Sequence, residues 1–232
     1  MKIFKPIVLC LLLAVLLCSC TKGNSNTENS ETQAETSETI ESDSTLNGDS
    51  SKIIGTWICE DISDECYFIF DEKGDAFAKW GTCTVYGYYD YYEEDDTYDI
   101  DIPNFLYNEY EASFSKNDMI LKSDTSSYTF EKAEMPKITI KAPDNLTVDK
   151  DIVGNWQSED SYECYKFNQD GTATVTDLYN YATVDCKFTC DKGVVTLYSM
   201  ASETKENTRE MKYSLKDSKL TLDDIEFEKV EE

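Results

Sequence analysis

The residues of this chain that are best suited to chemistry are tyrosines and carboxylates, and they gather in residues 85–101. The tyrosines of this stretch that could contact a ligand are Tyr86, Tyr88, Tyr89, Tyr91 and Tyr92. Tyrosine offers a large, stiff contact area at low entropic cost, which suits a small hydrophobic ligand, a glycan or a protein partner. Tyrosine also favours strands, so in the alternative interpretation half of these rings pack inward and half cover a sheet.

The same stretch carries carboxylates that could bind calcium, because this hard cation takes several carboxylate oxygens. They are Glu93, Glu94, Asp95, Asp96, Asp99 and Asp101. Their spacing does not match the EF-hand loop, in which ligands at alternate positions precede an obligatory glycine. The pattern therefore favours a solvated acidic loop, and we assign no metal ligand and expect no cofactor. Calcium-dependent adhesion remains an alternative.

The chain contains no histidine. This absence removes the usual general base, the Ser-His-Asp and Cys-His nucleophile systems and most catalytic zinc sites. A pair of carboxylates, as in glycosidases, would be the best remaining catalytic design. Pairs of acidic residues do not indicate catalysis here, because they occur throughout a chain with 47 aspartates and glutamates. We therefore predict that the protein is not an enzyme, and we assign no catalytic residue.

The net charge of the chain also limits its partners. At pH 7 the formal charge is -26, and Arg209 is the only arginine. Phosphate binding requires clustered lysines and arginines, so the composition excludes a nucleic-acid footprint. An acidic surface of this size keeps a protein soluble and attracts cations.

Two repeats position these residues. Gly55 and Trp57 open the first repeat, residues 53–132, and Gly154 and Trp156 open the second, residues 152–230. In both repeats a Glu-Cys-Tyr, a Phe and an acidic turn ending in glycine follow the Gly-x-Trp. Both close on Phe-Glu-Lys, at residues 130–132 and 227–229. A repeat of this kind fixes the number of domains and the phase of the strands.

Both repeats are predicted to be β-structure. In the second, Val184, Cys186, Phe188 and Cys190 alternate with polar residues, which is typical of a half-buried strand. In the first, strands are predicted at residues 66–70, 76–80, 82–89, 98–102, 110–115, 119–122 and 127–132. Many short strands separated by turns indicate a sandwich or a barrel. Residues 135–150, with two prolines, are predicted to be an extended linker.

Six cysteines fall in the repeats, three in each: Cys59, Cys66, Cys83, Cys164, Cys186 and Cys190. Cys66 with Cys83 and Cys164 with Cys186 could form disulfides if the protein is exported. However, Cys66 lies eight residues before Gly74, whereas Cys164 lies seven before Gly171. The two cysteines should therefore face opposite sides of their strands unless a bulge intervenes. The favoured interpretation is that the cysteines are free thiols that act as small core hydrophobes.

The first segment of the chain predicts export. Lys2 and Lys5 precede an apolar run, residues 7–17, that is too short for a comfortable membrane span. The run ends in Leu-Cys-Ser-Cys, which resembles the signal of bacterial lipoproteins. The resemblance implies that residues 1–20 are a signal peptide, that Cys20 is acylated, and that the protein is lipid-anchored at the extracytoplasmic face of the cell membrane. Residues 21–51 are rich in Ser, Thr, Asn and Glu and are predicted to be a disordered tether.

The Gly-x-Trp opening, followed by a meander that ends in Phe-Glu-Lys, resembles the small lipocalin-like domains of bacterial lipoproteins. The resemblance implies an all-β fold of two tandem small antiparallel meander barrels, at residues 52–134 and 151–232. It gives Trp57 and Trp156 the role of closing one end of each barrel. In full lipocalins an arginine packs on this tryptophan; the first repeat has no counterpart, and Arg209 is the candidate in the second.

These inferences predict a membrane-anchored bacterial surface lipoprotein that acts as a non-enzymatic binding or envelope module through its two barrels. Any ligand would lie in a barrel mouth or against the tyrosine stretch. The alternative from another class is a structural spacer that binds no small ligand.

Overall fold

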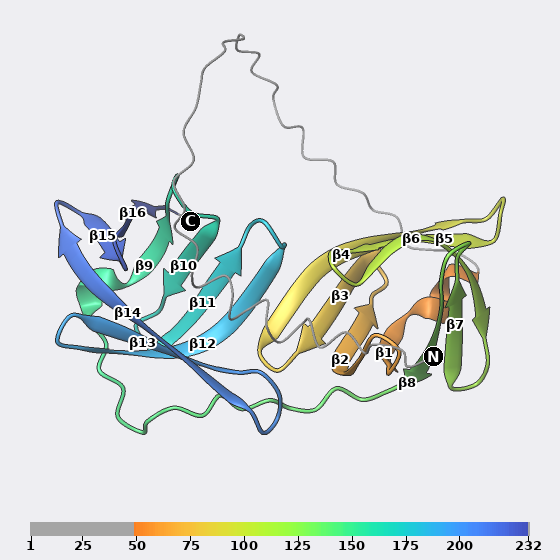
Figure 1. The fold of residues 1–232 in the computed structure, drawn as a ribbon, viewed down its shortest axis with the longest axis horizontal. Coiled ribbons are helices and arrows are strands. Elements are labelled where there is room, and N and C mark those ends of the chain that lie inside the picture. Colours follow the sequence, from red (N-terminus) through yellow and green to blue (C-terminus); the bar gives the residue numbers. More distant parts are fainter. Residues whose placement is uncertain (1–48, 232) are drawn as a thin grey trace, which may run out of the picture. The chain divides into compact units, whose positions relative to one another are not determined.

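The computed structural model describes residues 49–231, and the all-β prediction is confirmed there (Figure 1). Two short 3-10 turns, η1 (Asp49–Ile53) and η2 (Lys150–Ile152), precede the Gly-x-Trp strands. The predicted signal peptide, Cys20 and residues 21–48 of the predicted tether lie outside the described residues. Within residues 49–231, no helix is long and apolar enough to cross a membrane.

The first repeat contains eight antiparallel strands. They are β1 (Gly55–Cys59), β2 (Ser63–Phe70), β3 (Asp75–Trp80), β4 (Cys83–Tyr92), β5 (Thr97–Ile102), β6 (Leu106–Phe114), β7 (Asp118–Lys122) and β8 (Ser127–Lys132). Each strand pairs with the next along the chain, β1 also pairs with β8, and β4 pairs with both β3 and β5. The predicted strands of this repeat therefore lie close to the observed ones.

The second repeat has the same order of strands. They are β9 (Gly154–Gln157), β10 (Glu163–Phe167), β11 (Thr172–Asp177), β12 (Ala182–Asp191), β13 (Val194–Met200), β14 (Glu206–Lys216), β15 (Lys219–Leu222) and β16 (Ile225–Val230). β16 pairs with β9, and the pairing of β11 with β12 completes the ring. The result is a closed eight-stranded antiparallel barrel.

Alternation of side chains along the strands builds the core. Cys186, Phe188 and Cys190 of β12 are at most 5% exposed, as the period-two pattern predicts. Aromatic rings fill the interior of the second repeat: the centroids of Phe167 and Phe188 lie 4.9 Å apart, and those of Tyr165 and Phe227 lie 5.3 Å apart. A small eight-stranded barrel can be filled by its own side chains in this way.

One strand pair joins the two repeats into a single sheet. β4 and β12 run antiparallel, with Thr84 opposite Thr183 at the centre of the short ladder. The Asp185 amide donates a hydrogen bond to the Thr82 carbonyl at 3.0 Å, and the Tyr86 amide donates one to the Tyr181 carbonyl at 2.8 Å. The N-terminal half of β4, which β5 does not cover, is therefore paired with the second repeat.

Candidate binding surface

A lysine covers each tryptophan of the Gly-x-Trp motifs. Lys132 Nζ lies 5.3 Å from the centroid of the Trp57 ring, and Lys229 Nζ lies 5.4 Å from that of Trp156. The indoles are at most 3% exposed. Their Nε1 atoms donate hydrogen bonds to the carbonyl of the residue four positions earlier, Ile53 at 2.8 Å and Ile152 at 2.7 Å. In both repeats, therefore, the lysine of the closing Phe-Glu-Lys lies against the motif tryptophan.

The two motif glycines leave room for these lysines. Gly55 and Gly154 have φ of 143° and 139°, a conformation that L side chains rarely adopt. A Cβ on Gly154 would lie 2.4 Å from Lys229 Cε, whereas one on Gly55 would lie 3.4 Å from Lys132 Cε. The backbone conformation therefore favours glycine at both positions, and only at position 154 would a side chain also displace the end of the neighbouring lysine.

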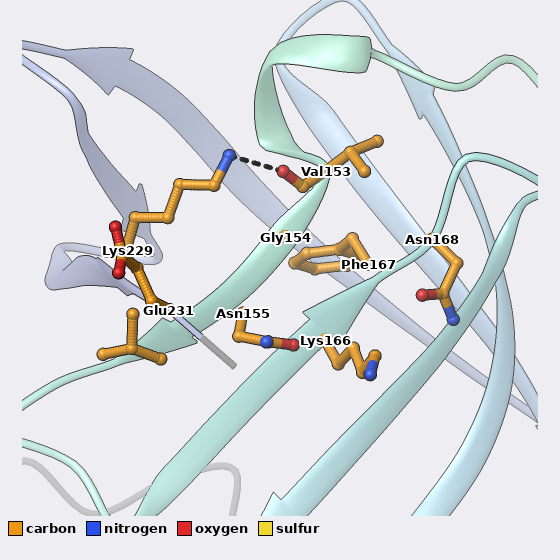
Figure 2. Close-up of a pocket in the computed structure, with 9 residues that line it drawn as sticks. Val153, Gly154, Asn155, Lys166, Phe167, Asn168, Lys229 and Glu231 are labelled. Carbon is orange, nitrogen blue, oxygen red and sulfur yellow. Dashed lines mark hydrogen bonds between the residues drawn. The ribbon is translucent and has the colours of Figure 1, made fainter.

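A surface pocket of about 610 Å³ lies beside the Lys229 end of the second repeat (Figure 2). It is lined by residues of β9, β10 and the end of the chain, among them Asn155, Lys166, Asn168 and Glu231. Lys229 Nζ donates a hydrogen bond to the Val153 carbonyl at 2.7 Å, as the dashed line in Figure 2 marks. The Val153 carbonyl and the Trp156 ring therefore already engage the ammonium group of Lys229. Because its charge stabilises the fold, we assign no ligand to the pocket.

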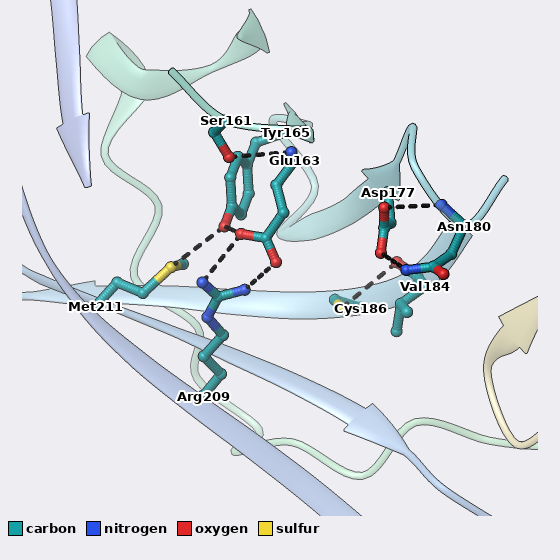
Figure 3. A network of polar contacts seen from close by, with 9 residues as sticks. All are labelled: Ser161, Glu163, Tyr165, Asp177, Asn180, Val184, Cys186, Arg209 and Met211. Carbon is teal, nitrogen blue, oxygen red and sulfur yellow. Dashed lines mark hydrogen bonds and ion pairs between the residues drawn. The ribbon is translucent and has the colours of Figure 1, made fainter. Parts of the chain in front are cut away.

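Arg209 does not pack on Trp156 but forms an ion pair at the far end of β10 (Figure 3). Its two terminal nitrogens donate hydrogen bonds to Glu163 at 2.9 and 3.1 Å. The Tyr165 hydroxyl donates to the same carboxylate at 2.5 Å, and burial raises the pKa of this hydroxyl. The Glu163 and Arg209 side chains are about a quarter exposed, at 25% and 24%. This network stabilises the charge of the Glu163 carboxylate, which faces inward.

Strand register explains why only the second repeat needs this ion pair. Trp57 lies opposite Phe68, and Trp156 lies opposite Tyr165. Counting back two residues on β2 and β10 places Cys66 at the position of Glu163.

Cys66 is 1% exposed, whereas Cys164 is half-buried on the other side of its strand. The predicted difference in strand face between the two cysteines is therefore confirmed.

All six cysteines of the described residues are free thiols. Burial raises the pKa of Cys66, Cys83 and Cys186 to about 12. Such thiols are protonated at neutral pH and behave as small apolar groups.

The tyrosine stretch is a hairpin and not a loop. Residues 83–92 form β4, residues 93–96 form the turn, and β5 follows. Tyr86, Tyr88 and Tyr92 point outward and are 44%, 50% and 47% exposed. Tyr89 points inward, is 1% exposed, and donates a hydrogen bond to the Asp71 carbonyl at 2.5 Å.

Tyr91 is half-buried, and its hydroxyl donates to Asp96 at 2.8 Å. Of the five tyrosines predicted to bind a ligand, three are therefore exposed on one side of β4. Tyr89 and Tyr91 instead support the hairpin. This division follows the alternative interpretation, in which alternate rings pack inward from a strand.

A fourth exposed tyrosine joins this surface from β6. Tyr107 is 80% exposed and lies opposite Asp101, which in turn lies opposite Tyr88. The next row across the same three strands is Asp90, Asp99 and Glu109. We name this surface the β4–β6 outer face. It consists of Tyr86, Tyr88, Tyr92, Tyr107, Asp90, Asp99, Asp101 and Glu109.

Like charges crowd the β4–β6 outer face. Partial burial and the neighbouring carboxylates of Asp90, Glu109 and Asp101 raise the pKa of Asp99. The carboxylate of Asp101 likewise raises the pKa of Tyr88. Across residues 49–231, no three Asp, Glu or Cys side chains converge as a metal ion requires.

Tyr107 could not be predicted as part of this surface, because its position on the same face as Tyr88 depends on the register of two turns. A second group of exposed tyrosines was also missed. Tyr162, Tyr179 and Tyr181 are 64–70% exposed on turns of the second repeat, and the rings of Tyr162 and Tyr179 lie 5.6 Å apart. Their sequence signal is weak, since they fall in short turns and not in one rich stretch.

Comparison with known proteins finds no family model that matches the chain and no significantly similar curated protein.

Proposed function

We propose that the protein is a membrane-anchored bacterial surface lipoprotein that acts as a non-enzymatic binding module. Its lipid would be carried by Cys20, and residues 21–48 would tether the folded part to the membrane. Its folded part would consist of two tandem barrels of the small lipocalin type. The ligand would bind the outer surface of the first repeat rather than a barrel interior.

The proposal of two lipocalin-like barrels is supported by the strand pairings and by the motif residues. Both repeats have the same order of eight strands, and in both the tryptophan of the first strand lies under the lysine of the last. In lipocalins a tryptophan of this kind closes one end of the barrel. Aromatic side chains fill the interior of the second repeat, which leaves the outer surface as the better candidate for binding.

The observation that carries the binding proposal is the exposure of four tyrosines on one sheet face. Tyr86, Tyr88, Tyr92 and Tyr107 are each 44–80% exposed, and the strands beneath them hold the rings in fixed register. Surfaces built from rigid aromatic rings bind partners at low entropic cost. A spacer would gain nothing from such a surface, because exposed aromatic rings favour association.

The first experiment is native mass spectrometry of residues 49–232 purified from the original host without reduction. Extra mass that disappears on denaturation would identify a small ligand, and co-purified protein would identify a partner. The variant Tyr86→Ala/Tyr88→Ala/Tyr92→Ala/Tyr107→Ala should lose that species and keep its fold. The control Tyr162→Ala/Tyr179→Ala/Tyr181→Ala removes equally exposed rings elsewhere and should retain it. Retention by both variants would mean that the species binds outside the β4–β6 outer face, and a wild-type protein that carries no bound species would favour the structural spacer.

The anchor is tested separately by metabolic labelling with a fatty-acid analogue. The wild-type protein should incorporate the label and partition into the membrane fraction, whereas Cys20→Ser should do neither. Unlabelled wild-type protein would exclude the lipid anchor.

Calcium-dependent adhesion is the second candidate. It rests on the number of carboxylates in the β4–β5 hairpin, of which no three converge in the described residues. It predicts that millimolar calcium raises the melting temperature, since a ligand that binds only the native state stabilises it by mass action. An unchanged melting temperature would remove this candidate.

A further inference from the structure

Three carboxylates form one row across the β4–β6 outer face. Asp90 lies opposite Asp99, and Asp99 lies opposite Glu109, so the row takes one side chain from each of three adjacent strands. Neighbouring strands are about 4.8 Å apart, and like charges directly opposite each other on a sheet are destabilising. A cation bound to this row would relieve the repulsion.

The row beside it alternates rings and charge. Tyr88, Asp101 and Tyr107 are paired across the same strands, with the two exposed rings on either side of the carboxylate. An ammonium or guanidinium group is attracted both by carboxylates and by the face of an aromatic ring. Rings and carboxylates in one surface therefore select the same kind of ligand.

The described part of the chain does not itself supply this cation. Within residues 49–231, Asp90, Asp99, Asp101 and Glu109 form no ion pair; Glu109 accepts a hydrogen bond from the Thr97 hydroxyl at 2.9 Å. The single arginine, Arg209, is bound to Glu163. A cationic partner must therefore come from outside this part.

We propose that the β4–β6 outer face binds an extended segment of another protein in which lysine or arginine occupies alternate positions. Asp99 and Asp101 are two residues apart on β5, so their side chains lie on the same face about 7 Å apart along the strand. Alternate side chains of an extended segment have the same spacing. The segment would lie along β5, with its cations over the two rows and its aliphatic stems against the tyrosine rings.

Charge complementarity argues for this occupant over an anionic or apolar one, because the whole chain carries a net charge of -26. The geometry argues against a bare metal ion, since the carboxylates form rows and do not converge. This inference rests on the proposed binding function and names the class of its partner.

The test is titration of the soluble protein, residues 49–232, with an octapeptide in which lysine alternates with serine. Isothermal titration should show binding that weakens as salt is added, because salt screens exposed charges. A block peptide of the same composition, with its lysines together, should bind less tightly. Equal affinity for the two peptides, or equal affinity per charge for spermine, would overturn the proposal in favour of unspecific attraction of cations.

Matched variants separate the surface from the net charge. Asp90→Asn/Asp99→Asn/Glu109→Gln removes three charges from the face and should weaken peptide binding by about tenfold or more. Glu93→Gln/Glu94→Gln/Asp95→Asn removes three charges from the adjacent turn and should weaken it by less than about twofold. Equal losses would overturn the proposal. Circular dichroism should show that both variants are folded.

Failure of this inference is distinguishable from failure of the proposed function. If the native partner is lost from the tyrosine variant while the alternating peptide fails to bind the wild-type protein, the surface binds a ligand of another class. If neither the peptide nor any native species binds, the binding function fails as well.

Discussion

Lys229 Nζ lies over the Trp156 ring, 5.4 Å from its centroid, and donates a hydrogen bond to the Val153 carbonyl. Trp156 belongs to the first strand of the repeat and Lys229 to the last, and the two residues are paired across the ladder that joins β9 to β16. The contact therefore links the first strand of the repeat to the last. Lys132 and Trp57 repeat it in the first half of the chain.

Replacing Lys229 with methionine should reveal what the ammonium group contributes. Methionine keeps a similar aliphatic length but loses the attraction to the ring and the hydrogen bond to Val153, so we expect a loss of about 1 kcal/mol in the free energy of unfolding. Lys132→Met is the control, because Lys132 has the ring contact but no such carbonyl bond among the described residues. Urea unfolding measures both. A loss at Lys132 as large as that at Lys229 would contradict the role of the hydrogen bond.

Gly154→Ala should destabilise the protein more than Gly55→Ala does. Both substitutions strain a backbone with positive φ, at a cost of about 1–3 kcal/mol. Only the alanine at position 154 also displaces Lys229 from the Trp156 ring. In a Lys229→Ala background the cost of Gly154→Ala should therefore fall to that of Gly55→Ala. Additive effects in this double-mutant cycle would show that the lysine is not displaced.

The ion pair between Glu163 and Arg209 predicts a specific pattern of rescue. Arg209→Met leaves an inward-facing carboxylate without its cation and should cost about 1–3 kcal/mol in unfolding free energy. Arg209→Lys should recover only part of this loss, since lysine cannot form the bidentate contact. Glu163→Gln/Arg209→Met should recover most of it. If the double variant is no more stable than Arg209→Met, the carboxylate is not the source of the cost.

The six described cysteines should differ widely in their reaction with iodoacetamide. Burial raises the pKa of Cys66, Cys83 and Cys186 to about 12, so almost no thiolate is present at pH 8. Burial also raises the pKa of Cys164, but this residue is the only one of the six that is not fully buried. Peptide mapping of the native protein should therefore show that Cys164 is alkylated about tenfold or more faster than the three cysteines with strongly raised pKa values. Uniform labelling would indicate global opening.

Asp99 should make the protein less stable as the pH rises. Burial and the carboxylates of Asp90 and Glu109 raise the pKa of Asp99 above its ordinary value of 3.8, so the folded state holds this proton more tightly than the unfolded state. Its contribution is fully present below that ordinary value and is lost as pH rises through the folded pKa. At pH 7, Asp99→Asn should therefore be more stable than wild type, by less than about 1 kcal/mol.

The difference between Asp99→Asn and wild type should disappear below about pH 3.5, where the carboxyl is protonated in both states. Asp95→Asn, in the exposed turn, is the control and should change stability little at either pH. Urea midpoints at the two pH values decide the question. A variant less stable than wild type at pH 7 would show that the carboxylate row is not repulsive.

The sequence predicts those parts of the fold that local pattern determines. The turn glycines Gly74 and Gly171 set the strand phase, so counting back from them places Cys66 and Cys164 on opposite faces, as observed. What the sequence does not predict is which distant strands meet. The sequence shows a lysine in each Phe-Glu-Lys motif. The contact of this lysine with the tryptophan depends, however, on the pairing of the first strand with the last. Tyr107 joins the β4–β6 outer face for the same reason.

The β4–β12 ladder is symmetric, and this symmetry has a consequence for the isolated halves. Because Val85 and Val184 hold equivalent positions in the two repeats, Thr84 is equivalent to Thr183, and the two face each other at the centre of the ladder. The strand pair is therefore isologous, as in a two-fold dimer. A single repeat would carry an open edge complementary to its own copy, which is a hazard for aggregation. Linking two repeats in one chain covers both edges at any protein concentration.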